Sequence, residues 1–379
     1  MRFGAPWAFT DLLVMDRRTR NLDPGSIVML EDSNRETVGI GAFNPNSKIG
    51  FRMMDMSPDA KIDALWLEAR ITRALELRNK LFAEPYYRLV HAEADGLPGL
   101  IIDRFGDVAV IQPNAAWAET HLDMIVAALA KVTGVTGVYK NASGRSRKLE
   151  GLDEVSAVVL GNVPDLLDVP MNGAIYKADV LQGQKTGIFF DQRDNHAFAA
   201  RLAKGGSVLD VFSHVGGFAL AALAGGATSA LAVDASQPAL DLAEAGAAAS
   251  GVADRFLTRK GDAFDAMVSL ASENQTFDTV ICDPPAFAPA KQALEAGLRA
   301  YDRAARNAAG LVKPGGYLVL CSCSHAADLT KFREACMRGI GKAGRRAQIV
   351  HTGAAAPDHP THPYLAETSY LKALFLRLD

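Results

Sequence analysis

From about residue 170 onward, apolar strand-like runs alternate with helical stretches, and this pattern limits the fold more than any other feature. The strand-like runs lie at 207–213, 229–235, 277–285 and 316–324. Such alternation is typical of a doubly wound, mostly parallel sheet whose two faces are covered by helices. We therefore predict a Rossmann-like α/β domain over residues 170–379. Its functional residues should lie beyond the carboxyl ends of the strands, where open α/β sheets bind their ligands.

The earlier part of the chain has a different pattern. Short strand-like runs at 26–32, 37–43 and 49–54 are separated by Asp-Pro-Gly and Asn-Pro-Asn turns. This pattern predicts a small β-rich, barrel-like domain over residues 1–58. Residues 59–169 combine long helical periodicity with further strands, so we expect an α+β middle domain there.

Composition excludes several classes of protein. Hydrophobic residues make up 49% of the 379 residues and charged residues 22%, which is usual for a globular protein. The only four cysteines, Cys282, Cys321, Cys323 and Cys336, are too few for a secreted disulfide scaffold. The first residues lack a long apolar segment, so we expect no signal peptide and a cytoplasmic location.

One uncharged segment has to be tested for membrane insertion. Residues 216–233 contain no charged side chain, but they are rich in Ala and Gly and are interrupted by Gly225-Gly226. A short buried helix followed by a strand explains this segment better than a membrane span, which needs about 20 apolar residues. We therefore expect no contact with a membrane.

The charge distribution bears on nucleic-acid binding. The net charge of −3 gives no global attraction to RNA, but basic clusters occur at 17–20, 140–148 and 342–346. Each cluster alone is best explained as a solvated surface. Together the three clusters are compatible with an RNA-binding surface but do not establish one.

Acidic residues follow the predicted strands in a regular way. The stretch VLDVFSHVGGFALAAL is a strand, a glycine turn and a helix, but it lacks the G-x-G-x-x-G pattern of dinucleotide sites. Asp234 ends the next strand, where a carboxylate can accept both ribose hydroxyls of a nucleoside cofactor. Asp262 ends the third strand and could accept an adenine amino group, and Asp283 opens an Asp-Pro-Pro turn after the fourth. This set is typical of class I S-adenosylmethionine (SAM) methyltransferases; the alternative is a doubly wound domain with acids there by chance.

Three stretches carry a more specific resemblance. Residues 182–195 (QGQKTGIFFDQRDN), 208–223 and 282–324 (CDPPAF to CSCS) resemble the bacterial ribosomal RNA large subunit methyltransferase I family. Members of this family are class I SAM-dependent cytosine-C5 methyltransferases with an N-terminal PUA domain. The likeness extends over essentially the whole chain. It implies an RNA-binding PUA domain, 23S ribosomal RNA as the partner and 5-methylcytidine as the product.

Together, the strand-end positions and the resemblance assign the site residues. The resemblance implies that the cofactor is flanked by Gln192, Arg193, Phe212, Ser213 and Gly216, and the strand-end positions add Asp234 with Ala235, Asp262 with Ala263, and Asp283. The substrate site is assigned to Lys185, Pro284, Pro285 and Phe287. Two departures from the family pattern concern the substrate: Ala286 stands where the family usually has Lys, a contact that Lys291 could supply, and His214-Val215 replaces the usual Tyr-Thr.

The cysteines decide which chemistry is available. C5 of cytosine is a poor nucleophile until a thiolate adds at C6, so the reaction needs one reachable cysteine. The resemblance places this nucleophile at Cys323, in the Ser-Cys-Ser motif of the last parallel strand, with Asp283 nearby as the second catalytic residue. Cys321 and Cys282 should pack inside the sheet.

Other roles for these cysteines are less favoured. Cys282, Cys321, Cys323 and His325 could in principle bind zinc, but structural zinc sites usually place ligands as C-x₂₋₄-C on turns. A redox dithiol would need C-x-x-C rather than C-x-C. We therefore expect no metal.

Two alternative functions stay open. One is a SAM-dependent RNA N- or guanine methyltransferase that uses the Asp-Pro-Pro motif without a cysteine nucleophile. The other is a non-catalytic RNA-binding protein, against which the intact set of acids and Cys323 argues. The sequence also leaves the oligomeric state open, including a homodimer.

Overall fold

The computed structural model describes residue 1 and residues 4–181 and 187–379, which form two compact units. The first unit comprises Met1–Leu167, Asp179–Gly187 and Pro357–Thr368. The second unit comprises Asp168–Ala178, Ile188–Ala356 and Ser369–Asp379. Each unit draws on separate stretches of chain, and the domain boundaries expected at residues 58 and 169 stay predictions.

The first unit begins with an antiparallel sheet in the order β1-β4-β3-β2. Its elements are β1 (Trp7–Phe9), α1 (Arg17–Arg20), β2 (Ser26–Glu31), β3 (Thr37–Phe43) and β4 (Ile49–Asp55). The β-rich prediction is correct, but the barrel-like closure is not found among the described residues. The edge strand β1 has only three residues and pairs with β4 alone, so the sheet stays open.

A second sheet of the first unit has the order β5-β6-β7-β8-β9. Its strands are β5 (Tyr86–His91), β6 (Leu100–Phe105), β7 (Val108–Pro113), β8 (Gly137–Lys140) and β9 (Ala157–Leu160). The helices around it are α2 (Ala64–Leu81), α3 (Ala116–Thr120), α4 (Leu122–Thr133) and α5 (Arg145–Glu150). Asp63 caps α2 by accepting a hydrogen bond from the Trp66 amide, and Leu67 and Ile71 bury one face of the helix in the core.

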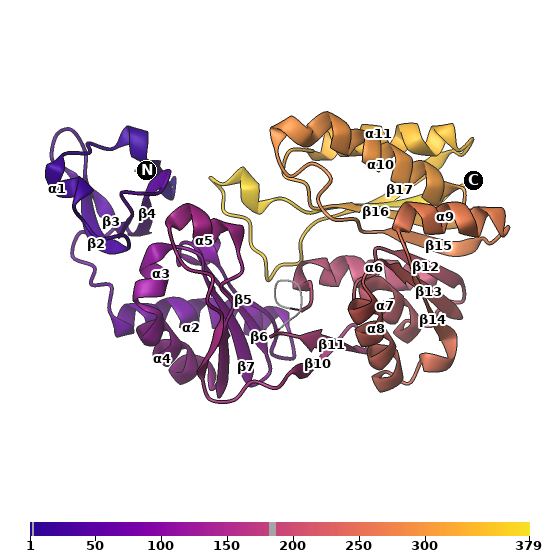
Figure 1. Ribbon diagram of the computed structural model, residues 1–379, viewed down its shortest axis with the longest axis horizontal. Coiled ribbons are helices and arrows are strands. Elements are labelled where there is room, and N and C mark those ends of the chain that lie inside the picture. The colour runs from indigo at the N-terminus through magenta and orange to yellow at the C-terminus, as the bar shows by residue number, and fades with distance from the viewer. Residues whose placement is uncertain (2–3, 182–186) are drawn as a thin grey trace. The chain divides into compact units, whose positions relative to one another are not determined.

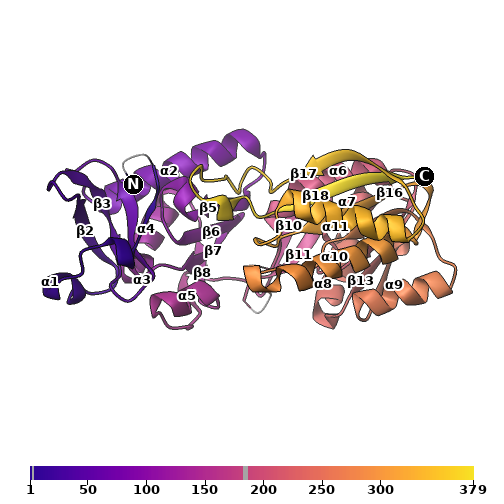
Figure 2. The same cartoon turned by 90° about the horizontal axis from the view of Figure 1, so that it is seen from above.

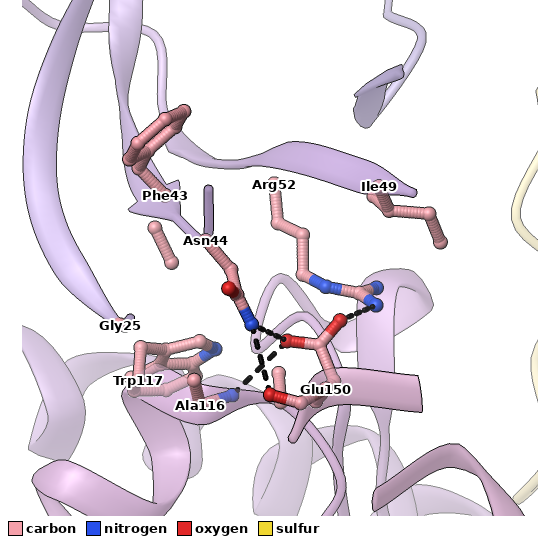
Figure 3. A pocket seen from close by; sticks show the side chains of 10 residues that line it. Gly25, Phe43, Asn44, Ile49, Arg52, Ala116, Trp117 and Glu150 are labelled. Carbon is pink, nitrogen blue, oxygen red and sulfur yellow. Dashed lines mark hydrogen bonds and ion pairs between the residues drawn. The ribbon is translucent and has the colours of Figure 1, made fainter. Parts of the chain in front are cut away.

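A buried carboxylate at the end of helix α5 connects this helix to the first sheet within the first unit (Figure 3). Glu150 accepts hydrogen bonds from Asn44 Nδ2 at 3.0 Å and Ser47 Oγ at 2.7 Å, and it pairs with Arg52 at 3.0 Å. Burial raises the pKa of Glu150, but Arg52 and the two hydrogen bonds lower that pKa below its ordinary value. The cavity beside it measures about 10 Å³, which is room for about one water.

The second unit contains a seven-stranded sheet in the order β14-β13-β12-β15-β16-β18-β17. Its strands are β12 (Ser207–Val211), β13 (Ser229–Asp234), β14 (Phe256–Lys260), β15 (Phe277–Cys282), β16 (Val312–Ser322), β17 (Ala347–Gly353) and β18 (Lys372–Leu378). The pairs from β14 to β16 are parallel, whereas β18 runs antiparallel to both of its neighbours. A hairpin of β10 (Leu166–Met171) and β11 (Ala174–Asp179) precedes this sheet in the chain.

Helices cover both faces of the sheet, as the alternating pattern predicts (Figure 1, Figure 2). They are α6 (Arg193–Ala203), α7 (Gly217–Ala224), α8 (Gln237–Ala249), α9 (Ala263–Ser272), α10 (Leu294–Ala309) and α11 (Leu329–Lys342). The last three share one hydrophobic core with β15, β16 and β18, and α6 to α8 lie on the other face. The uncharged segment 216–233 forms α7 and most of β13, as predicted. No helix in the described part of the chain is long and apolar enough to cross a membrane.

Candidate functional site

The candidate site lies at the carboxyl ends of β12 and β15, where the strand order reverses. The chain builds β13 and β14 on one side of β12 and then returns to place β15 and β16 on the other side. Val211 at the end of β12 stands opposite Val233 of β13 and Cys282 of β15. The next residues, Phe212, Asp234 and Asp283, therefore meet at one edge of the sheet, which is where such folds bind ligands.

The turn after β12 has an unusual backbone. Phe212, His214 and Gly216 all have positive φ angles, of 64°, 50° and 78°. Positive φ is costly for residues other than glycine and is found mostly where function requires it. Hydrogen bonds hold this conformation: the Ser213 amide donates to Val233 O at 3.0 Å and the Gly216 amide to Ser213 O at 2.8 Å.

Asp234 braces the same turn from the neighbouring strand. Its Oδ2 accepts a hydrogen bond from the His214 amide and its Oδ1 one from the Ser236 amide, both at 2.9 Å. The carboxylate is half-buried and the adjoining Ala235 is exposed. Because each carboxylate oxygen can accept about two hydrogen bonds, Asp234 can also bind an external hydroxyl group.

Asp262 lies two residues beyond β14 and caps helix α9, instead of ending the strand as the sequence suggested. Its Oδ1 accepts hydrogen bonds from the amides of Phe264 at 2.9 Å and Asp265 at 3.1 Å. The side chain is exposed and the following Ala263 is buried. The cap fixes where this carboxylate lies and leaves it open to solvent.

Two buried polar atoms at this edge have no hydrogen-bond partner among the described residues: Asp210 Oδ1 and Ser213 Oγ. Burial, together with the charges of Asp283 and Asp234, raises the pKa of Asp210 to about 8. Buried polar atoms normally have a hydrogen-bond partner. Asp210 Oδ1 and Ser213 Oγ are therefore suited to form hydrogen bonds with a polar ligand. Sequence reasoning did not select Asp210, although its position in VLDVF, before the turn, was a usable signal.

Aromatic side chains border the acids. The rings of Phe212, Phe264 and Phe287 lie 6.1–6.2 Å from one another, and the Arg303 guanidinium is 4.3 Å from the Phe264 ring. The site therefore combines a patch of aromatic rings with carboxylates along a single edge.

Asp283 connects this edge to the segment before α6. Gln192 donates from Nε2 to Asp283 Oδ2 at 2.9 Å, and its Oε1 accepts from Asn195 Nδ2 at 2.6 Å. Gln192 is buried, and the Arg193 guanidinium lies 5.4 Å from the Phe190 ring. The structure thus brings together Gln192 and Asp283, which lie 91 positions apart in the sequence.

Of the residues assigned to the substrate, Pro284 is buried, Pro285 is exposed and Phe287 is half-buried. Lys185 lies outside the described residues. Lys291, the alternative for the lysine missing at Ala286, is exposed.

The four cysteines differ in exposure. Cys282, Cys321 and Cys336 are buried, and Cys323 is the half-exposed member of the set. Burial raises the pKa of each of the three buried thiols well above its ordinary value. Packing of Cys282 and Cys321 is therefore confirmed. However, β16 ends at Ser322, so Cys323 lies one residue beyond the strand and not within it.

The two serines around Cys323 are anchored from helix α10. Ser322 Oγ donates to the Tyr301 hydroxyl at 2.8 Å, and this hydroxyl lies 2.7 Å from Ser324 Oγ. Ser324 Oγ also accepts from the Ala288 amide at 2.9 Å, and both serines are fully buried. The backbone on either side of Cys323 is thereby fixed.

The sequence gives no signal for Tyr301, because it is one residue of an amphipathic helix with no motif around it. His325 packs against the ring of Tyr370, with ring centroids 5.7 Å apart. In the described part of the chain, no cluster of three or more His, Cys, Asp or Glu side chains could hold a metal ion.

Comparison with known proteins identifies the two parts. The model of a SAM-dependent methyltransferase family matches residues 124–377, and that of a PUA-like domain matches residues 1–55. The Alteromonas mediterranea protein named ribosomal RNA large subunit methyltransferase I is 37% identical over 99% of this chain and 95% of its own length. The chain belongs to this methyltransferase I family. The Erwinia tasmaniensis member is 33% identical over 98% of this chain and 95% of its own length.

Solved structures agree with the fold expected of the family. A methyltransferase in complex with SAH superimposes with a TM-score of 0.82 at 21% identity, covering 99% of this chain and 96% of that one. A candidate SAM-dependent methyltransferase from Streptococcus mutans gives a TM-score of 0.81 at 22% identity, with the same coverage. Family membership and fold confirm the prediction of a β-rich PUA-like domain and a Rossmann-like methyltransferase domain, with SAM as the cofactor.

Proposed function

We propose that this chain is a cytoplasmic SAM-dependent methyltransferase of 23S ribosomal RNA that forms 5-methylcytidine through a covalent adduct with Cys323. Relatives that share a third or more of its residues over nearly their full length are named as methyltransferases of large-subunit ribosomal RNA. The RNA class rests on those names, and the position of the methyl group rests on the cysteine.

The observation that carries the proposal is the contrast between Cys323 and the other three cysteines. A nucleophile must be reachable and must ionise, and burial prevents both for Cys282, Cys321 and Cys336. Cys323 lies half-exposed just after β16, the strand adjacent to β15, which Asp283 follows. An enzyme that methylated an amino group would have no need of a reachable thiol held between two anchored serines.

The chemistry assigns roles to the chain's own residues. The Cys323 thiolate adds to C6 of the cytosine, and the electron pair displaced from the C5–C6 bond makes C5 nucleophilic. Bound SAM would supply the electrophilic methyl group, its sulfur–methyl bond breaking as C5 bonds to the methyl carbon, with SAH as the leaving group. A base then removes the C5 proton, the C6–sulfur bond breaks, and the thiolate leaves unchanged. Asp283, whose carboxylate accepts a hydrogen bond from Gln192, would accept a hydrogen bond from the base.

The residues present fit SAM. Asp234 would take the ribose hydroxyls and Asp262 the adenine amino group, beside the aromatic rings of Phe212 and Phe264. The unpartnered Asp210 Oδ1 and Ser213 Oγ would meet polar atoms of the cofactor, and Gln192 and Arg193 would flank it. Gly216, Ala235 and Ala263 contribute backbone rather than side-chain groups.

The remaining assignments concern the base. Pro284 and Pro285 cannot donate backbone hydrogen bonds and stiffen the turn after Asp283, so its carbonyl groups can face the target cytosine. Phe287 would border the base, and Lys185 would contact the RNA backbone.

RNA containing 5-fluorocytidine tests this function. Fluorine at C5 cannot leave as a proton, so the adduct cannot eliminate and the enzyme should be trapped on the RNA through Cys323. Peptide mapping of the adduct identifies the attacking residue. Cys323→Ala should abolish turnover and trapping while SAM affinity stays unchanged.

Cys321→Ala is the matched control, because it removes a thiol two residues away that is buried in the sheet. Methyl transfer should persist, with a loss of at most a few kcal/mol of stability from the small cavity. Full activity in Cys323→Ala would exclude cytosine-C5 chemistry, and an adduct on Cys321 would reverse the assignment.

A further inference from the structure

Lys372 is a buried lysine next to the proposed nucleophile. It is the first residue of β18 and stands opposite Ser322 in the antiparallel pair with β16. Its Nζ donates hydrogen bonds to Ser324 O at 2.7 Å and Ala327 O at 2.8 Å, and only 8% of the residue is exposed. These acceptors lie just after Cys323, so the ammonium group is enclosed by the loop that carries the thiol.

A buried cation is costly unless an anion or several dipoles compensate for the lost water. The two carbonyl oxygens are neutral acceptors and offset only part of this cost. Consistent with this, burial lowers the pKa of Lys372, whereas negative charge at Cys323 and at Asp328 raises it. Tyr301 and Asp283 also face this region, but the Tyr301 hydroxyl is bonded to the serines and Asp283 is bonded to Gln192.

Cys323 has the complementary need. A thiolate forms readily only where a cation or helix N-terminus is near, and here the neighbouring carboxylates would oppose ionisation. Lys372 is the enclosed cation on the strand beside the cysteine loop.

We propose that Lys372 positions and activates Cys323, its ammonium charge stabilising the thiolate while its two hydrogen bonds hold the loop after the cysteine. The thiol proton passes to solvent and no other group is consumed. This inference rests on the proposed function, because it assumes that Cys323 acts as a thiolate.

Alkylation by iodoacetamide measures the thiolate directly and needs neither RNA nor SAM. The full chain is labelled over a range of pH, and peptide mapping gives the rate at Cys323, with the buried Cys321 and Cys336 as internal controls. Lys372→Gln should shift the midpoint of the rate upward by about one pH unit, so labelling at pH 7 falls about tenfold. Lys372→Arg keeps the charge and should restore most of the rate.

Lys313→Gln is the matched control, since Lys313 lies near the start of β16 and pairs with Asp278. It should leave the rate at Cys323 unchanged. If Cys321 or Cys336 becomes labelled in Lys372→Gln, this variant has lost its fold. The midpoint of the alkylation rate at Cys323 in the wild-type protein then tests the proposal. A wild-type midpoint below the value of about 8.5 for free cysteine supports the proposal, and one at or above it overturns it.

An unchanged midpoint in a folded Lys372→Gln protein also overturns the role of Lys372, and would do so even if 5-fluorocytidine traps Cys323. Conversely, a shifted midpoint without any RNA adduct would support the electrostatic role and contradict the proposed function. Alkylation therefore tests the role of Lys372, and trapping by 5-fluorocytidine tests the proposed function.

Discussion

At the residue scale, carboxylates crowd one edge of a sheet and each is held by a different partner. Asp234 accepts hydrogen bonds from the His214 amide of the glycine turn and from the Ser236 amide, Asp283 accepts one from the Gln192 side-chain amide, and Asp262 caps a helix. Asp210 lies buried among them, and its raised pKa reflects both burial and the charges of Asp234 and Asp283. A buried carboxyl group whose pKa is raised by burial and by neighbouring carboxylates is a recognised mark of functional sites.

Asp234→Ala tests the ribose assignment. The change removes a charged acceptor for the ligand and the hydrogen bond that Asp234 accepts from the His214 amide of the turn, so SAM affinity should fall by at least about 1.5 kcal/mol, or about tenfold. Isothermal titration calorimetry measures this loss. Asp254→Ala, which alters an exposed carboxylate of the same unit, should bind SAM normally. Unchanged affinity in Asp234→Ala would remove Asp234 from the cofactor site.

At the element scale, helix α10 fixes the end of strand β16. The Tyr301 ring packs between Phe287 and Phe332, with centroids 5.0 Å and 4.9 Å away, while its hydroxyl joins Ser322 and Ser324. Burial raises the pKa of Tyr301 to about 12, so the hydroxyl stays protonated and able to donate at neutral pH. The Tyr301 side chain thus fixes the loop that carries Cys323 relative to helix α10.

Tyr301→Phe keeps the ring and deletes only this hydroxyl. Two buried serine hydroxyls lose a partner, which should cost about 1–3 kcal/mol of stability. We expect kcat to fall because the Cys323 loop is less well fixed, while SAM affinity stays the same. Steady-state kinetics and calorimetry separate the two effects. Tyr317→Phe, at a half-exposed position of the same strand, is the control; equal kinetics in both variants would contradict the clamp.

The sequence predicts helices and strands well where the hydrophobic periodicity is strong. It does not predict strand ends or neighbouring side chains that are determined by contacts between distant parts of the chain. Alternating apolar runs located β12, β13, β15 and β16 but not β14, the edge strand of the parallel part of the sheet. The predicted end of β16 was also too late, because the strand ends one residue before Cys323, where its backbone leaves the ladder with β18. Lys372 had a faint signal, a cation that opens the apolar run KALFLRL, whose other cation, Arg377, is exposed. Its closeness to Cys323 follows from the antiparallel return of β18, which local sequence does not determine.

At the scale of the whole molecule, the chain combines a PUA-like domain with a methyltransferase domain, and we expect the basic clusters to make the first contact with RNA. The net charge of −3 gives no long-range attraction, so binding has to come from local cations. In the PUA-like domain, Arg17 and Arg18 are fully exposed on α1, whereas the Arg20 guanidinium bonds to Met15 O. Arg18 also forms an exposed ion pair with Asp16 at 3.8 Å, which contributes little, so both Arg17 and Arg18 can turn to phosphates at a small structural cost.

The structure also shows how RNA binding by the PUA-like domain should be tested. Deleting residues 1–58 would uncover Glu150, whose buried carboxylate depends on Asn44, Ser47 and Arg52, so weaker binding could come from damage to the rest of the first unit. Substitution of exposed side chains avoids this difficulty, because Arg17 and Arg18 contribute nothing to that network.

Arg17→Gln with Arg18→Gln should therefore weaken binding to ribosomal RNA fragments while SAM affinity and folding are unchanged. Each lost phosphate contact lowers the slope of log affinity against log salt by about 0.7 for single-stranded RNA, so the pair should reduce it by about 1.4. Filter binding over a range of salt measures the slope. The double variant Lys331→Gln with Arg333→Gln removes two exposed cations from α11 and should keep the wild-type slope. An equal slope in both double variants would mean that α1 does not contact RNA and that another of the basic clusters carries the electrostatic term.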